Sequence, residues 1–216
     1  GFTSSAQNPV ISNVTSINAG NYDVVVTDAN GCGSTTGTTT VVVNDNPVID
    51  NISNDGPACV GSDLTLSVSV SGGSAPYNYS WTGPDGFSSS VQNPVVSNVT
   101  TSNAGDYDVV VTDANGCSVA SASTTVIVYQ RPSVNLPDVS TCEGKDATLS
   151  AEPSSGSGNY VNYVWYDNGS IIPGENNSQL VLSGSDVDLA NNGNTYSVTV
   201  EDNNGCISLP DDMTLT

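Results

Sequence analysis

A long internal repeat constrains the fold of this chain more than any other feature. Residues 1–32 and residues 86–117 differ at only six of 32 aligned positions, and the offset between the two segments is 85 residues. Near-identity over such a length indicates recent duplication of one unit. Because the offset is that of one small domain, we expect a tandem array of domains.

A third, diverged copy of the unit follows the other two. The octapeptide CVGSDLTL, which begins at Cys59, is matched by CEGKDATL, which begins at Cys142. The turn that ends in Asn-Gly-Cys117 is matched by the turn that ends in Asn-Gly-Cys206. We therefore predict the second half of one unit and then two complete units, with the boundaries 1–45, 46–130 and 131–216.

The first part of the chain is expected to be an incomplete unit. Gly1 aligns with Gly86, which lies in the middle of a unit. Half a sandwich leaves its strands without partners, so we expect a longer array or a second chain to supply the missing half. Short proline-containing linkers at 44–47 and 130–132 predict semi-rigid connections between neighbouring units.

Short segments of alternating polarity predict the fold class. The segments 65–70 and 148–151 alternate with period two. The β-branched segment 107–112 leads through an Asp-Ala-Asn-Gly turn into a return strand at 122–128. Helical periodicity over three turns is found nowhere. The prediction is all-β, with tandem immunoglobulin-like β-sandwich domains in a linear array whose first domain is truncated.

Two pairs of aromatic residues support this prediction. Trp81 and Trp165 each follow the alternating segment of their unit, and Tyr107 and Tyr196 each open a later strand. An immunoglobulin-like sandwich places a core Trp on strand C and a corner Tyr at the start of strand F. We therefore predict that all four side chains lie in cores. The functional alternative is a tryptophan that stacks on a ligand.

The charge balance narrows the classes of function. There are 22 acidic and 2 basic residues and no histidine, so the formal net charge is −20. Binding to the phosphates of nucleic acid or of an anionic membrane surface needs clustered Lys and Arg. Because the chain has only two basic residues, both are excluded as partners. The longest apolar runs are too short to insert into a membrane. Without an activated nucleophile or a phosphate-binding loop, we predict no enzyme and no catalytic or cofactor-binding residue.

A group of motifs resembles a known family. The motifs are YSWTGPDGFS from Tyr79, QNP from Gln92, AGDY from Ala104 and DANGC from Asp113. They resemble the Ig-like/PKD-like repeats of very large secreted Bacteroidetes surface proteins, including gliding-motility adhesins and other cargo of the type IX secretion system. The resemblance implies an extracellular, adhesin-like or filament-forming role and identifies no ligand. The third unit departs from it at 167–174, which reads DNGSIIPG.

The five cysteines favour an oxidising, extracytoplasmic setting, and their odd number leaves at least one without a partner in the chain. In a sandwich, Cys59 lies at the base and the turn cysteines lie at the top, too far apart for a bridge within a unit. End-to-end stacking brings Cys59 to Cys206, the pairing we favour. The same stacking pairs Cys117 with the missing part of the first unit, Cys142 with a following unit and Cys32 outside the chain. One changed strand direction would restore the alternative, Cys59–Cys117 with Cys142–Cys206.

Many carboxylates fall in turns, where Asp usually accepts hydrogen bonds from nearby backbone N–H groups. The functional alternative is Ca²⁺ held at a junction between units, with Asp113 and Asp202 as candidate ligands. No calcium-loop motif is present. We otherwise expect no metal and no cofactor.

These observations predict a structural or adhesive repeat segment of an extracellular cell-surface protein or filament. Its expected partners are neighbouring repeats of the same longer chain or filament, together with a surface glycan or protein ligand. One alternative is a ligand-binding module whose loops at one end recognise glycan or protein. Another is a filament subunit whose incomplete unit is completed by strand donation.

Overall fold

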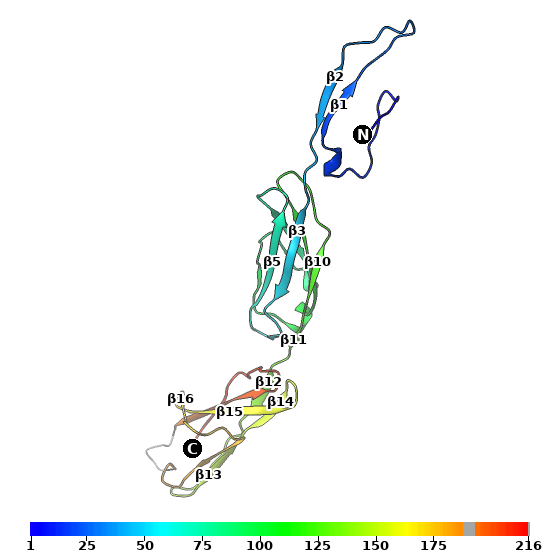
Figure 1. The fold of residues 1–216 in the computed structure, drawn as a ribbon. Coiled ribbons are helices and arrows are strands. Elements are labelled where there is room, and N and C mark those ends of the chain that lie inside the picture. The colour runs from blue at the N-terminus through cyan, green and yellow to red at the C-terminus, as the bar shows by residue number, and fades with distance from the viewer. Residues whose placement is uncertain (188–192, 216) are drawn as a thin grey trace.

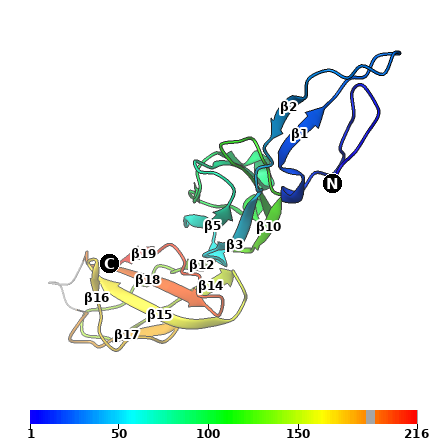
Figure 2. The same cartoon turned by 45° about the horizontal axis from the view of Figure 1, so that its top comes forward.

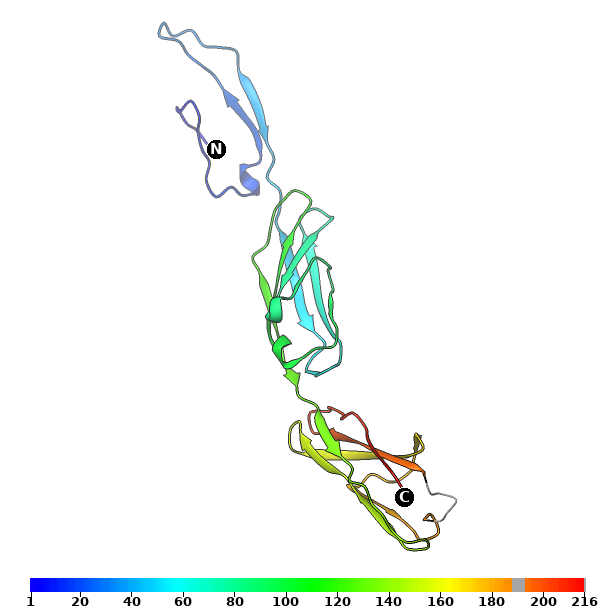
Figure 3. The same ribbon diagram turned by 180° about the vertical axis from the view of Figure 1, so that it is seen from behind.

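The computed structural model of the chain describes residues 1–187 and 193–215. Three units follow one another along a line, joined by single extended segments, and the two termini lie in opposite end units (Figures 1 and 3). Over the described ranges the chain is built from strands and short 3₁₀ turns. Within these ranges, no helix has the length and apolar character needed to cross a membrane.

Unit one is an antiparallel hairpin with an extended N-terminal segment folded beside it (Figure 2). Its elements are η1 (Ser16–Asn18), β1 (Gly20–Val24) and β2 (Gly37–Val41). Tyr22 lies opposite Thr39 in the pairing of β1 with β2. Most side chains of the unit are exposed. Unit one therefore has strands and turns but no buried core.

Unit two is a complete two-layer sandwich. One sheet has the order β3 (Pro47–Asn54), β5 (Leu64–Gly72), β8 (Val95–Val96). The other has the order β10 (Ala122–Val126), β9 (Gly105–Thr112), β6 (Asn78–Thr82), β7 (Ser88–Ser89). The remaining elements are a short parallel pair and two 3₁₀ turns, namely β4 (Ala58–Cys59) with β11 (Val128–Tyr129), η2 (Pro84–Gly86) and η3 (Thr101–Asn103).

The alternation in β5 explains how unit two forms its core. Leu64, Leu66 and Val68 are buried, and the residues between them are more exposed. The facing sheet contributes Trp81 and alternate residues of β9. Full burial of one such aliphatic side chain stabilises a fold by about 1.5–3 kcal/mol. The buried core consists of Ala58, Leu64, Leu66, Val68, Trp81, Val96, Val99, Tyr107, Val109, Val111 and Val126.

Unit three repeats the sandwich with an interrupted second strand. One sheet has the order β16 (Ser170–Ile171), β15 (Tyr160–Asp167), β18 (Thr195–Asp202), β19 (Asp211–Thr214). The opposite layer pairs β13 (Ala147–Ser150) with β17 (Gln179–Leu182), and β12 (Pro132–Asn135) with β14 (Glu152–Ser155). Its core includes Leu149, Trp165, Leu180, Tyr196, Val198 and Met213.

The core aromatics are oriented by hydrogen bonds to the backbone. The indole N–H of Trp81 donates to the Gln92 carbonyl at 3.2 Å, and that of Trp165 donates to the Asn177 carbonyl at 2.8 Å. Because these rings are enclosed by other core side chains, they offer no free face to a stacked ligand. The four predicted core aromatics are each exposed by 3% or less: Trp81, Tyr107, Trp165 and Tyr196.

Candidate functional site

The junction between units two and three is linked twice. The chain crosses it between β11 and β12, and a disulfide joins Cys59 to Cys206, 147 residues apart in the sequence. The Cα atoms of the two cysteines lie 5.6 Å apart, which is the usual separation for a disulfide. The structure thus contains the bridge between units that stacking favours.

Backbone pairing places Cys59 at the base of unit two. Strand β4 runs parallel to β11 with Cys59 opposite Tyr129, so this cysteine lies beside the segment by which the chain leaves the unit. The N–H of Val60 donates to the Tyr129 carbonyl at 2.9 Å. Ser62 donates its N–H and its hydroxyl to the Cys59 carbonyl, at 3.0 and 2.8 Å. These bonds hold Cys59 at the junction independently of the bridge.

A buried carboxylate holds Cys206 at the top of unit three. Asp202 is fully buried at the end of β18. Its Oδ1 accepts the N–H groups of Asn204 and Cys206, both at 3.0 Å, and its Oδ2 accepts the N–H of Ser157 at 2.8 Å. The turn is closed by the Asp202 N–H, which donates to the Cys206 carbonyl at 3.0 Å. One side chain therefore shapes the turn and ties it to the loop after β14.

Hydrogen bonding decides the ionisation of this carboxylate. Burial by itself would raise the pKa of Asp202, but N–H donors from Ser157, Cys206 and Asn204, with the Ser157 hydroxyl, lower it below its ordinary value. The ionised form is therefore the form that fits the turn. The pKa of Asp113 in unit two is lowered in the same way, against the effect of its burial.

The hydrogen bonds of Asp202 and Asp113 leave few free oxygen lone pairs for Ca²⁺. The Asp202 carboxylate accepts three backbone N–H groups, and that of Asp113 accepts the N–H groups of Ser74, Asn115 and Cys117 at 2.8–2.9 Å. A Ca²⁺ ligand needs oxygen lone pairs directed at the ion. Among the described residues, no group of three His, Cys, Asp or Glu side chains is placed to hold a metal. The geometry assigns both carboxylates to turns, and calcium binding at a junction stays a prediction.

The alternative pairing within units is wrong for Cys59 and Cys206. Cys117 lies in a turn bonded to the loop at Ser74, which follows β5. The end of β5 pairs with Pro47, where the chain enters unit two. Cys117 is thus at the entry end of the sandwich and Cys59 at the exit end. Three cysteines are free: Cys32 and Cys142, which are exposed, and Cys117, which is half-buried.

The junction also forms a polar groove around the bridge. Asp55, Asp63 and Arg131 line it from unit two and the linker, and Ile207 and Ser208 line it from unit three. Arg131 is one of only two basic residues in the chain. Its Nε is buried and has no hydrogen-bond partner within the described part of the chain. Arg131 therefore lies in a groove with two acidic side chains. Among the described residues, this is the only junction that has both a chain connection and a disulfide.

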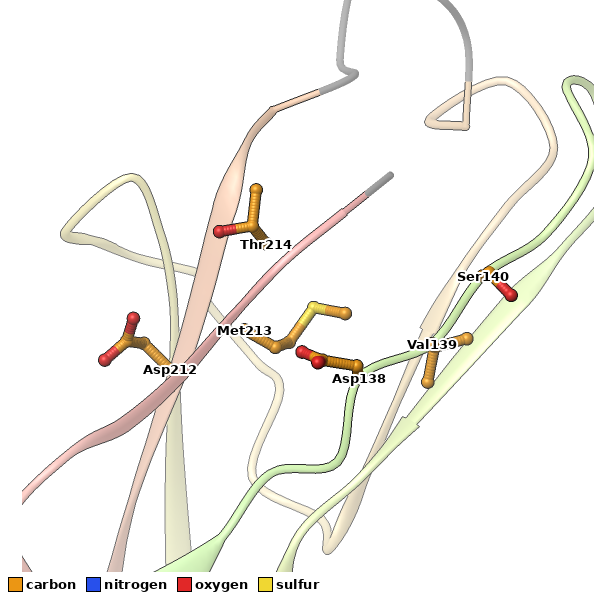
Figure 4. Close-up of a pocket in the computed structure, with 6 residues that line it drawn as sticks. All are labelled: Asp138, Val139, Ser140, Asp212, Met213 and Thr214. Carbon is orange, nitrogen blue, oxygen red and sulfur yellow. The ribbon is translucent and has the colours of Figure 1, made fainter.

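A second groove lies at an edge of unit three. Residues 138–140 run past β19 without pairing, and Asp138 and Met213 face each other across the gap (Figure 4). Two carboxylates, those of Asp138 and Asp212, line the groove, and no third acidic, cysteine or histidine side chain among the described residues joins them. The arrangement is an open edge and has no feature of a reactive centre.

Sequence reasoning missed two contributors to the junction. Ser157 supplies a backbone N–H to Asp202, as Ser74 does to Asp113. A signal was available, since each serine follows a glycine at the same place in its unit. Arg131 carried no such signal, because a single basic residue in a linker has no pattern.

Comparison with known proteins supports the repeat architecture. Residues 51–128, most of unit two, match the PKD domain family. The decoration protein of Escherichia phage T5 is 38% identical over 79 residues, which cover 34% of this chain and 45% of that protein. The chain thus spans less than half the length of this curated relative.

Solved structures resemble the chain over nearly its whole length. The I-band fragment I67–I69 of titin matches with a TM-score of 0.51 at 18% identity, covering 94% of this chain and 76% of that one. The N-terminal eight Ig domains of Down syndrome cell adhesion molecule match with a TM-score of 0.47 at 22% identity, covering 93% and 28%. The titin likeness shows the fold, which is a tandem array of immunoglobulin-like sandwiches.

Proposed function

We propose that the chain is a segment of an extended spacer on a cell surface or in a secreted filament, in which disulfides stiffen the junctions between Ig-like units. The proposal includes a structural or adhesive role outside the cell. The PKD match and a relative named as a decoration protein are in keeping with it. The partners we propose are neighbouring repeats, with a glycan or protein bound at exposed loops as the adhesive function.

The observation that carries this proposal is the bridge between Cys59 and Cys206. A linker of a few residues leaves two domains free to bend about it. A second covalent connection at the same junction removes most of that freedom. The array then keeps its reach, which is the property a spacer needs and a compact binding domain does not. The disulfide also supports an oxidising, extracytoplasmic location, because disulfides persist in such compartments.

The surface suits a solvated rod. With a formal net charge of −20, neighbouring chains repel one another at low ionic strength. On the outer face of unit two, the hydroxyl of Thr125 donates to Asp106 at 2.6 Å, and Ser123 donates to Asp108. Cross-strand bonds of this kind satisfy acidic side chains locally and keep the sheet surface polar.

Small-angle X-ray scattering tests the spacer function. The double variant Cys59→Ser with Cys206→Ser should broaden the distribution of maximum dimensions, because the junction regains its hinge. Cys142→Ser removes a free, exposed cysteine and is the matched control. It should scatter like the parent chain. A double variant as extended and as narrowly distributed as the control would contradict the proposal.

The parent protein we propose is a large secreted surface protein of the Bacteroidetes type, a gliding-motility adhesin or another cargo of the type IX secretion system. The support is the motif resemblance of unit two, from Tyr79 to Cys117. Loss of the parent from the surface of cells lacking that secretion system would support this origin. Glycan-array binding by the full chain would support a glycan as the ligand of the adhesive function.

A further inference from the structure

The apolar face of unit one is open where the same face of unit two is closed. Val24 and Val26 are 59% and 65% exposed, whereas Val109 and Val111, their counterparts in the repeat, are fully buried. Single exposed apolar side chains are ordinary on protein surfaces. A set that the same repeat buries elsewhere in the molecule marks an interface.

Unit one already has the conformation of the complete unit. The hydroxyl of Tyr22 donates to the Asn18 carbonyl at 2.9 Å, and that of Tyr107 donates to the Asn103 carbonyl at the same distance. The 3₁₀ turns before these tyrosines, η1 and η3, carry the same capping box. The open face is therefore preorganised, which lowers the entropy cost of docking onto it.

Phe2 indicates where the missing strands would join. Its ring packs edge-on against Tyr22 with centroids 6.1 Å apart, as Phe87 packs against Tyr107 at 5.3 Å. In unit two the chain reaches Phe87 from β6 through the turn η2. Gly1 stands at the corresponding place in unit one. A segment joined to Gly1 would therefore run onto the open face.

Unit two shows what covers this face. Residues 46–85 supply β3, β5 and β6, which bring Leu64, Leu66 and Trp81 into the core. Trp81 lies opposite Val109 in the pairing of β6 with β9. Because residues 1–32 and residues 86–117 differ at only six positions, a first half that covers one fits the other.

Cys117 is an independent sign of the same segment. Its N–H donates to Asp113 at 2.8 Å, as the N–H of Cys206 donates to Asp202 at 3.0 Å. Cys206, held in this way, is bonded to the base cysteine of the preceding unit, whereas Cys117 is free. A first half on unit one would bring the counterpart of Cys59 to Cys117.

We propose that the open face of residues 1–45 is a docking surface for a first-half segment of the same repeat, of the sequence type of 46–85, joined on the N-terminal side of Gly1. Docking completes one sandwich core and presents the segment's base cysteine to Cys117. The two thiols then lose two protons and two electrons to a disulfide oxidant such as oxidised glutathione, which is reduced to two thiols. The inference rests on the repeat geometry and holds whether or not the chain acts as a spacer.

The test places a second copy of residues 46–85 directly before Gly1 of the full chain and refolds it in a glutathione redox buffer. Val60→Ile in the added copy marks its cysteine peptide by mass. Amide hydrogen exchange of β1 should slow by about 100-fold or more, toward the rate of β9. Peptides of unit one are recognised by Ile17. Disulfide mapping should recover the marked peptide linked to Cys117.

The matched control carries Leu64→Asp and Leu66→Asp in the added copy only. It keeps the length and the cysteine but cannot form the core, so β1 should exchange as fast as in the parent chain. Unchanged exchange in the extended chain, or equal protection in the control, would overturn the proposal. Protection of β1 in the parent chain through association of two copies would also overturn the proposal. If β1 is protected in the extended chain but the Cys59–Cys206 bridge does not stiffen the array, only the spacer function is contradicted.

Discussion

Units two and three share the positions that build the sandwich and differ in how their strands pair. Each buries a tryptophan and a tyrosine on neighbouring strands of one sheet, and each ends the tyrosine strand with a buried Asp whose carboxylate orders a cysteine turn. Unit two pairs one unbroken strand, β5, with both β3 and β8, whereas unit three divides the equivalent strand into β13, which pairs with β17, and β14, which pairs with β12. Core and turn positions therefore carry the fold, while strand pairing varies between the two units.

The largest expected effect separates the two cores. Trp165→Ala should cost unit three about 3–5 kcal/mol, because the cavity cannot collapse fully. Unit two should keep its stability in this variant. Trp81→Ala should instead destabilise unit two and leave unit three unchanged. Urea unfolding followed by hydrogen exchange of each unit measures both effects. Equal destabilisation of the two units by one substitution would show that their cores are not independent.

The next effect tests the difference between the two turn cysteines. Cys206→Ser should lower the free energy of unfolding by about 2–4 kcal/mol, since it removes a long closed loop. Cys117→Ser removes a cysteine from the matching turn of unit two, where it is free. It should leave the parent chain's stability unchanged within error. Urea titration under oxidising conditions compares the two, and a similar loss in both variants would contradict the structural distinction.

A glycine pair tests the close approach beneath the Asp202 turn. A Cβ on Gly156 would lie 2.6 Å from the Asp202 Oδ2 and 3.0 Å from the Pro132 nitrogen. Gly158 has a similar positive φ, 78° against 61°, but nothing within 4 Å. Gly156→Ala should therefore cost about 1–3 kcal/mol more than Gly158→Ala, because only the first is overpacked. Thermal unfolding checks this, and equal costs would show that backbone strain alone matters.

The lowered pKa of Asp202 predicts a stability that depends on pH. Since the folded-state pKa lies below the unfolded value, the carboxylate contributes stability above the unfolded pKa, and this contribution is lost as pH falls through the folded pKa. Asp202→Asn should thus differ most from the parent chain near neutral pH and least in acid. Denaturation at several pH values measures the difference. A gap between the two proteins that widens in acid would reverse the sign and refute the account.

The smallest expected effect concerns calcium. The melting temperature should be the same in EDTA and in millimolar Ca²⁺, because backbone N–H donors occupy the carboxylates of Asp113 and Asp202. An increase of several degrees in the melting temperature in Ca²⁺ would show that the chain binds calcium. The variant Asp202→Asn then tells where: if the increase survives the substitution, the calcium site does not involve the Asp202 turn.

Much of the fold could be predicted from local patterns. Alternation at 65–70 reports which side of a strand faces the core, and this depends only on the period of the strand. The corner Tyr107 and the Asp-x-Asn-Gly-Cys turn at Asp113 are likewise local arrangements of neighbouring residues. The loop contacts of Ser74 and Ser157 were missed because their carboxylate partners lie 39 and 45 residues away.

The sequence by itself determined that the chain is a series of β units, which residues build their cores and where each turn lies, because period and turn chemistry act over a few residues. Only the tertiary structure decided which cysteines are joined, since Cys59 meets Cys206 only after two sandwiches have formed and stacked base to top. It also decided that valines buried in unit two stay exposed in unit one. Burial belongs to a side chain's partners in space, and two nearly identical segments differ when one of them lacks those partners.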